Sequence, residues 1–360
     1  MGIQPLVIDD QVKSVIGARG QVRTAIDVAS TSEMRRFAHA VFDDNRIYFD
    51  AQAARASRFG TRVGPAPFIL TNMRPNIPFT DDAMRHIGPY DDVAAHRDMR
   101  PLPKGWEGRY EFHAGDEIEL YRLPHEGDLI SAHPFVKDIY GKSGRNGNLA
   151  FYVTRTDYKD QQGQLIACHD THLVFPEEIA ERRPQAKQQQ TSQEVEYPPA
   201  MPAPKPLDLP RVDFEDIKIG DQLPTKLIRI TVPIVVRWAM ATEAYRRDHY
   251  DYGFAAHAGH ANIIASGLWA LSCRWTYISH FAGRDGWAWK ISHQLRARMN
   301  IGDSLTASAV VTSLERREKY GLVQLDVNFT NQRGVLAVPG AATVALPYRG
   351  GPAVPYPFVP

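Results

Sequence analysis

RWAMATEAYRRDHYDYGFAAHAGHANIIASG, the stretch from Arg237 to Gly267, places a polar, titratable cluster after a short helical run and ends on a glycine. A weaker version of this stretch, RFAHAVFDDNRIYFDAQAARASRFGTRVGPAPF, runs from Arg36 to Phe68. Each copy starts with an apolar helical patch and continues through an [HY]-[FY]-D element to small residues and glycine. This repetition predicts a duplicated fold in which one copy kept a chemical site.

Strand signals follow each copy in the same order. Each half has a strand with a Gly-Asp turn, at Gly115-Asp116 and at Gly302-Asp303, and each ends with a hairpin, at 149–167 and at 322–338. Alternating β-branched and aromatic residues bounded by Asn, Asp and Gly are typical of antiparallel strands. One helix followed by several long strands, twice, predicts an α+β protein built from two tandem domains.

A Pro- and Gln-rich segment separates the two halves. Residues 181–211 are poor in aromatic residues, and such a composition favours an extended linker over a packed core. The sequence therefore predicts an N-terminal domain over 1–180 and a C-terminal domain over 212–360.

Composition narrows the class of protein. The 360 residues carry a net charge of +1 and include no long basic stripe, so we expect no nucleic-acid partner. No apolar run approaches the ~20 residues of a membrane span, and the N-terminus lacks the pattern of a signal peptide. The two cysteines, Cys168 and Cys273, are too few for a disulfide framework and fit a reducing cytoplasm.

The order and spacing of these segments, with GDEIELYRLPHEGD, IGDSLTASAVV and VNFTNQRGVLAVPGAATVALP, resemble a known family. The two halves are similar to the two hot-dog domains of MaoC-like (R)-specific enoyl-CoA hydratases and dehydratases. The first half resembles the fatty-acid-synthase-like dehydratase domain of that family. The resemblance implies a double hot-dog, in which a sheet wraps long helices and the substrate thioester lies between the paired units.

The family's site carries an Asp and a His in a D-x-N-P-[LI]-H pattern, followed by a glycine whose amide starts a helix. Adding water across an α,β-unsaturated thioester requires a base, an acid and a donor for the thioester oxygen. By resemblance, His249 takes the histidine position, and Gly267, 18 residues later, takes that of the oxyanion glycine. The aspartate position is Ala244, with Glu243 one residue earlier.

The missing aspartate leaves three interpretations open. Glu243 could replace it through its longer side chain. His249 could act alone, oriented by Asp248 or Asp251. This chain could also run a different reaction. Residues expected to orient catalytic groups or to bind substrate are Asp248, Asp251, Arg246, Arg247, Tyr245, His260, Asn262 and Ser266.

The first copy shows the opposite loss. Asp43 and Asn45 are present, but Tyr48 stands at the histidine position, so this vestigial site is expected to shape the acyl pocket without catalysing. In the second copy Arg246 and Arg247 replace the Asn-Pro pair. They are either a solvated pair or ligands of a carboxylate or of CoA phosphates, which guanidinium groups bind in a bidentate manner.

We therefore expect a cytoplasmic lyase that hydrates an enoyl-CoA or dehydrates a 3-hydroxyacyl-CoA. His249 is the acid/base, Glu243 its carboxylate partner and the Gly267 amide the oxyanion donor. CoA thioester is the substrate, and we expect no metal and no other cofactor. The resemblance implies a homodimer or a higher homo-oligomer. The alternatives are an acyl-CoA thioesterase of the same fold and a non-catalytic acyl-CoA-binding subunit of a hetero-oligomeric hydratase.

Overall fold

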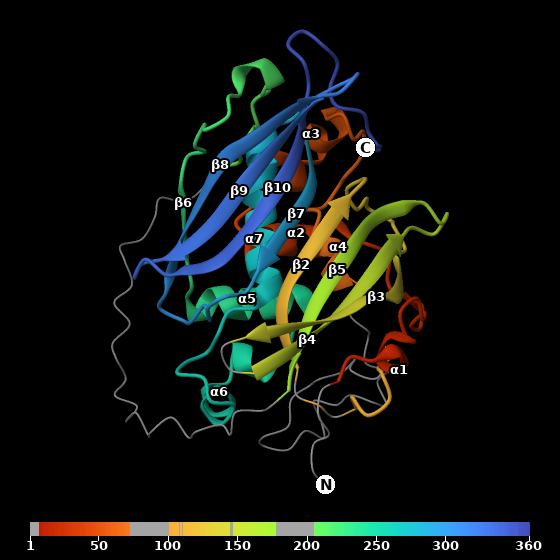
Figure 1. Ribbon diagram of the computed structural model, residues 1–360. Coiled ribbons are helices and arrows are strands. Elements are labelled where there is room, and N and C mark those ends of the chain that lie inside the picture. Colours follow the sequence, from red (N-terminus) through yellow and green to blue (C-terminus); the bar gives the residue numbers. More distant parts are fainter. Residues whose placement is uncertain (1–6, 73–100, 108, 110, 145–146, 178–204) are drawn as a thin grey trace.

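In the described part of the chain, ten strands form one antiparallel sheet to which both halves contribute (Figure 1). The computed structural model describes all residues except 1–6, 73–100, 108, 110, 145–146 and 178–204. The strand order is β1-β3-β4-β5-β2-β7-β10-β9-β8-β6, so the first five strands form one half of the sheet and the last five the other. This arrangement confirms the predicted α+β class.

The strands of the first half are β1 (Arg23–Thr24), β2 (Phe112–Leu120), β3 (Ser131–Gly144), β4 (Gly147–Lys159) and β5 (Leu165–Pro176). Those of the second half are β6 (Lys226–Arg229), β7 (Trp287–Gln294), β8 (Ser304–Arg316), β9 (Gly321–Asn331) and β10 (Leu336–Leu346). The α-helices are α1 (Asp10–Lys13), α2 (Thr31–Ala40), α3 (Ala51–Ala56), α4 (Phe68–Asn72), α5 (Val232–Thr242), α6 (Tyr252–His257) and α7 (Gly267–Ala282). The short 3-10 helices are η1 (Arg46–Tyr48), η5 (Phe214–Asp216) and η6 (Arg247–His249).

The two halves join where β2 pairs with β7. Asp116 lies opposite His293 in this pairing, and Ile118 lies opposite Ile291. Strands β2 and β7 approach so closely here that a Cβ on Gly115 would lie 2.2 Å from the His293 carbonyl oxygen. A glycine at this position is therefore required by close backbone contact.

Helix α7 occupies the core of the second half, with the sheet curving around it (Figure 1). Its sequence, GLWALSCRWTYISHFA, is apolar around most of its circumference, which is typical of a fully buried helix. Its Trp269 indole N–H donates to the Ala40 carbonyl at 3.0 Å and so links the helix to the first half. The buried Arg274 guanidinium donates to the carbonyls of Val327 and Val338, and burial lowers its pKa to about 9.

The repeated stretch folds in the same way in both halves. Helix α2 ends before Phe42 and α5 before Glu243, and these are the residues with left-handed backbone, at φ 56° and 52°. Each is followed by a 3-10 helix and then by a short helix capped by an aspartate, Asp50 or Asp251. The aspartate position of the motif, one residue after the left-handed residue, is thus Asp43 in one half and Ala244 in the other.

Most of the predicted linker, residues 181–211, lies outside the described residues. From residue 205 onward the chain contacts the first half, since the Leu207 amide donates to the Asp44 carbonyl and the Arg46 amide to the Leu207 carbonyl. The domain bounds 1–180 and 212–360 stay predictions. No helix in the described part of the chain is both long and apolar enough to cross a membrane.

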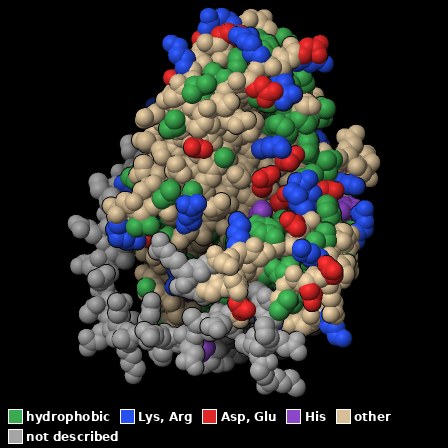
Figure 2. Space-filling model, in the orientation of Figure 1, with side chains coloured by type: hydrophobic (Ala, Val, Ile, Leu, Met, Phe, Trp, Pro, Cys, Tyr) green, Lys and Arg blue, Asp and Glu red, His purple; other side chains and the backbone are tan. Residues whose placement is uncertain are grey.

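Charged side chains of both signs gather on the outer face of the sheet (Figure 2). Lys290 of β7 donates to Glu119 of β2 at 3.0 Å, and Arg155 of β4 lies 3.7 Å from the same carboxylate. Arg155 and Lys137 also pair with Asp170. The Lys290–Glu119 pair crosses the junction of the halves, whereas the pairs of Arg155 and Lys137 join strands of the first half.

Candidate active site

The His249 imidazole lies at the end of η6, beside the segment that leads into α7. Its Nδ1 is 2.9 Å from the Ile264 carbonyl oxygen, so Nδ1 carries the proton and donates to that oxygen in the neutral ring. The Ile264 amide in turn donates to the Asp248 carbonyl at 3.1 Å. His249 is thereby held against Ile264, which lies three residues before Gly267.

Asp248 is the buried carboxylate next to this histidine. Its Oδ1 lies 3.6 Å from His249 Nδ1, and His260 Nε2 lies 3.8 Å from its Oδ2. The guanidinium of Arg246, about half exposed, donates through Nε to both oxygens at 3.1 and 3.2 Å. The structure therefore brings together Arg246, Asp248, His249 and His260.

Asp251 and Arg247 form a second group. Asp251 caps α6 by accepting from the Phe254 amide at 3.0 Å and pairs with Arg247 at 2.6 Å. The Arg247 guanidinium also lies over the Phe254 ring, 5.0 Å from its centroid. Backbone and guanidinium hydrogen bonds lower the pKa of Asp251. These contacts explain both residues as parts of the local fold, and the same pair recurs as Arg46 and Asp50.

Gly267 is the first residue of α7, so its amide is among the helix N–H groups that have no partner within the helix. A Cβ on Gly267 would lie 2.6 Å from Leu295 Cδ1 and 3.1 Å from His113 Nδ1. Ser266 precedes it as a buried N-cap whose side chain makes no capping hydrogen bond. Glycine therefore leaves room at the helix start, next to a histidine from the first half.

Glu243 ends α5 with an exposed side chain, whereas Ala244 is buried. Because Glu243 corresponds to Phe42 and not to Asp43, its carboxylate does not replace that of the motif aspartate position for position. Burial, followed by the Glu243 charge, raises the pKa of the neighbouring Tyr245. Asn262 uses its side-chain oxygen to accept from the Ile263 amide at 2.8 Å.

In the first copy the motif carboxylate is used structurally. Asp43 Oδ1 accepts from the Asn45 amide at 3.1 Å and lies 2.9 Å from Nε2 of His280, a residue of α7. Asn45 caps η1 through the Ile47 amide, and Tyr48 is buried. The three residues predicted for the vestigial site thus lie together, in contact with the second half.

A cluster that the sequence reasoning missed surrounds Asp116. The register of β2 places this buried aspartate opposite His293 of β7, 2.8 Å from its Nε2. His169 Nε2 of β5 lies 2.7 Å from Asp116, and His113 Nε2 lies 2.9 Å from it. The signal present in the sequence was the pair H-x-x-D at 113–116, which precedes the Gly-Asp turn seen only as a strand marker.

The protonation states in this cluster follow from burial and charge. Burial disfavours ionised Asp116, but the charge of His113 and the hydrogen bonds from His169 and His293 hold its pKa well below the usual range. Burial tends to lower the pKa of His113, yet the adjacent Asp116 charge raises it overall. Burial lowers the pKa of His293 to about 4, so this ring is neutral.

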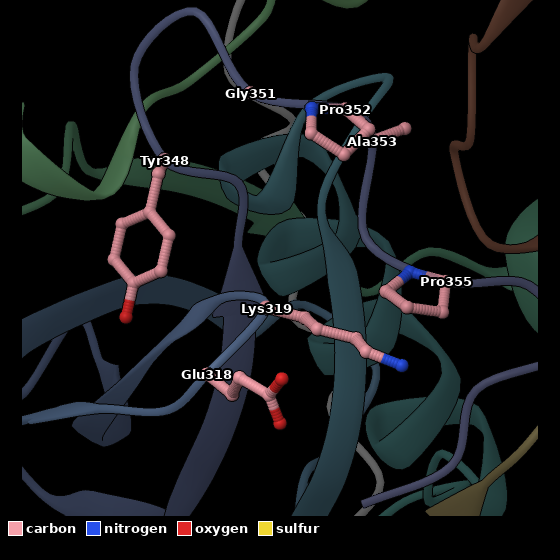
Figure 3. A pocket seen from close by; sticks show the side chains of 7 residues that line it. All are labelled: Glu318, Lys319, Tyr348, Gly351, Pro352, Ala353 and Pro355. Atoms are coloured by element: carbon pink, nitrogen blue, oxygen red, sulfur yellow. The ribbon is translucent and has the colours of Figure 1, made fainter.

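The described residues include no group of three or more His, Cys, Asp or Glu side chains arranged to hold a metal ion. They do include a surface pocket of about 280 Å³, lined by Glu318, Lys319, Tyr348 and the C-terminal segment 351–355 (Figure 3). This pocket lies at the β8–β9 turn, at the end of the molecule opposite α6 (Figure 1). It is therefore remote from His249.

Comparisons with known proteins agree with this architecture. Residues 14–169 match the family described as the FAS1-like dehydratase domain region. A probable enoyl-CoA hydratase alpha subunit of Thermomonospora curvata is 27% identical over 158 residues, 43% of this chain and 47% of that protein. The match thus spans about half the length of that relative.

Solved structures show the same fold over nearly the whole chain. A MaoC-like dehydratase aligns with a TM-score of 0.64 at 18% identity, covering 91% of this chain and 98% of its own. A double hot-dog protein of Mycobacterium tuberculosis aligns with a TM-score of 0.58 at 13% identity, covering 92% and 97%. A MaoC-like dehydratase of Phytophthora capsici gives 0.54 at 11%, covering 94% and 99%.

The chain therefore has the double hot-dog fold. Within it, residues 14–169 are similar to the FAS1-like dehydratase domain region. The double hot-dog fold and the likeness of the first half to the fatty-acid-synthase-like dehydratase domain, both expected from the sequence, are confirmed.

Proposed function

We propose that the protein hydrates an enoyl-CoA or dehydrates a 3-hydroxyacyl-CoA, with His249 as the acid/base and the Gly267 amide as oxyanion donor. The observation that carries this proposal is the bond from His249 Nδ1 to the Ile264 carbonyl. It fixes the tautomer so that Nε2 is the basic nitrogen, and it ties the ring to the segment that opens α7.

Hydration then needs few groups. His249 Nε2 takes a proton from water as the water oxygen bonds to the β-carbon of the enoyl thioester. The π electrons move toward the thioester oxygen, where the Gly267 amide stabilises the negative charge. The protonated His249 returns a proton to the α-carbon, and dehydration follows the reverse path.

The carboxylate partner of His249 is the part of this site that departs from the family pattern. Glu243 remains a proposed partner from the sequence, and Asp248 is supported by its position 3.6 Å from the ring. Asp248 acts as a positioning residue in this proposal, because Arg246 already pairs with both of its oxygens.

The test uses crotonyl-CoA hydration by the purified full chain. His249→Ala should lower kcat by at least ~100-fold, the scale of general acid–base catalysis. Asp248→Asn and Glu243→Gln compare the two carboxylates, and Asp251→Asn is the matched control because Asp251 caps α6. Unchanged turnover in His249→Ala would refute the assignment, and release of free CoA would indicate a thioesterase instead.

A second candidate is a non-catalytic acyl-CoA-binding subunit. It is favoured by Ala244 in the aspartate position and by the name of the Thermomonospora curvata relative, an alpha subunit. A hetero-oligomer of this kind would stand in place of the homo-oligomer expected from the sequence. Turnover of crotonyl-CoA by the isolated chain would exclude the subunit role, and binding without turnover would favour it.

A further inference from the structure

His113 of the first half lies beside Gly267, at the start of α7. Its ring spans the gap between two groups, with Nε2 2.9 Å from Asp116 and Nδ1 on the Gly267 side. A Cβ built on Gly267 would be 3.1 Å from His113 Nδ1 and 3.4 Å from its Cε1. The amide nitrogen and the Cβ position of one residue are close neighbours, so Nδ1 and the Gly267 amide border the same space.

This histidine is also accessible. Its side chain is 28% exposed, whereas the Asp116 carboxylate that contacts it is fully buried. Nε2 itself is buried on the side of the aspartate, so the exposed surface of this side chain lies on its other atoms. His169 and His293 contact the same carboxylate but lie deeper, with side chains 8% and 0% exposed.

The charge on His113 is set by its surroundings. Asp116 faces His113 from the same strand, and His293 faces it from β7 with the two ring centroids 6.4 Å apart. Arg246, between α5 and η6, is the nearby cation. Arg246 opposes protonation, yet the Asp116 carboxylate outweighs it and raises the pKa of His113. The imidazolium form places an N–H on Nδ1.

We propose that His113 Nδ1–H is a second hydrogen-bond donor to the substrate thioester oxygen, beside the Gly267 amide. The inference rests on the proposed function, because it assumes a thioester carbonyl at the start of α7. The catalytic contact would come from the first half of the chain and the acid/base, His249, from the second. Asp116 is then a positioning residue that holds His113 in place and charged.

His113 keeps its proton throughout the reaction. When water adds to the β-carbon, the C–O bond forms, the π electrons move to the thioester oxygen, and His249 takes the proton. The Nδ1–H bond shortens toward the enolate oxygen without transferring its proton. Protonation of the α-carbon by His249 then restores the carbonyl and the original hydrogen bond.

The test compares His113→Phe, which removes the donor but keeps a planar ring, with His113→Gln, which keeps a neutral donor. His133→Gln is the matched control, because His133 lies on β3, three strands away from β2, with its Nε2 3.0 Å from the Ser131 hydroxyl. With crotonyl-CoA, kcat should fall about 10²- to 10³-fold in His113→Phe, the loss typical of one oxyanion donor, and less in His113→Gln.

Wild-type activity should also decline as pH rises through the raised pKa of His113, because the donor is the protonated form. His113→Gln should lose this alkaline decline, a change that a purely structural role would not produce. Wild-type kcat in a folded His113→Phe would overturn the proposal. If His113→Phe does not fold, an unchanged pH profile in His113→Gln has the same consequence.

Infrared spectroscopy of bound butyryl-CoA labelled with ¹³C at the thioester carbon gives a readout without turnover. The carbonyl frequency should be lowered on wild-type protein, and part of the lowering should disappear in His113→Phe but persist in His249→Ala. Equal frequencies in wild type and His113→Phe would refute the role of His113 alone. Failure of butyryl-CoA to bind wild type would instead refute the proposed function.

Discussion

Gly267→Ala tests the start of α7 most directly, because the substitution adds one methyl group and leaves the backbone amide intact. The new Cβ would lie 2.6 Å from Leu295 Cδ1 and 3.1 Å from His113 Nδ1. Carbon atoms in contact prefer ~3.5–4.0 Å, so about 1 Å of movement is needed. The Leu295 side-chain tip can provide part of it, and the rest displaces His113 or the thioester oxygen.

The expected effects on activity and on stability differ. A displacement of about 1 Å at a reacting centre costs on the order of 10²-fold in rate, so kcat/KM for crotonyl-CoA should fall by about that factor. A helical Gly→Ala change gains roughly 0.5–1 kcal/mol, whereas overpacking costs roughly 1–3 kcal/mol. The free energy of unfolding should therefore change by no more than about 2 kcal/mol.

Hydration kinetics and urea unfolding measure these two quantities on the same preparations. Gly253→Ala is the matched control, because its Cβ would meet only Asp251 Oδ1 at an ordinary 3.4 Å, within the nearby helix α6. A Gly267→Ala protein with kcat/KM within about threefold of wild type would refute the placement of the thioester at the start of α7. A large loss of stability would show that the glycine serves packing alone.

Three further predictions concern stability. Folding lowers the pKa of His293 from 6.5 to about 4, so as pH falls the unfolded chain binds this proton first and the folded state loses stability. This loss amounts to roughly 3 kcal/mol at most between the two pH values, and His293→Gln should abolish it. Urea unfolding of both proteins at each pH measures the difference. Arg122→Met should lower the free energy of unfolding by about 3–5 kcal/mol, because it leaves Asp128 and Asp160 buried without the guanidinium that lies 2.7 Å from each. Arg317→Met removes one partner of an exposed ion pair and should change little in the same denaturation assay. Ser30→Ala should cost about 1 kcal/mol by removing the capping box with Glu33 at the start of α2, and thermal unfolding that matches wild type would contradict this.

Local patterns predicted the fold well. The α+β class and the two corresponding sets of antiparallel strands follow from the periodicity of residues and from turn residues such as Gly163 and Gly334. The equivalence of Asp43 and Ala244 was likewise visible, because both motif copies keep the same spacing. Those features depend on neighbours along the chain, which a sequence displays directly.

The Asp116 cluster could not be predicted in the same way. Its members come from β2, β5 and β7, and only the register of these strands, shifted by the bulge before Gly115, brings them together. A shift of one residue would turn Asp116 toward the outer face. The capping role of Asp251, by contrast, was readable from its position before a short helix, and could have been separated from catalysis at the start.

The use of Asp43 explains why the first copy cannot supply the carboxylate missing at Ala244. Asp43 is held by Nε2 of His280, which lies 13 residues after Gly267 on α7. At ~1.5 Å per residue, the two ends of this span are about 20 Å apart along the helix. The carboxylate of the first copy therefore contacts the wrong end of α7. Asp116, which reaches the start of α7 through His113, is the first-half carboxylate placed to influence the chemistry there.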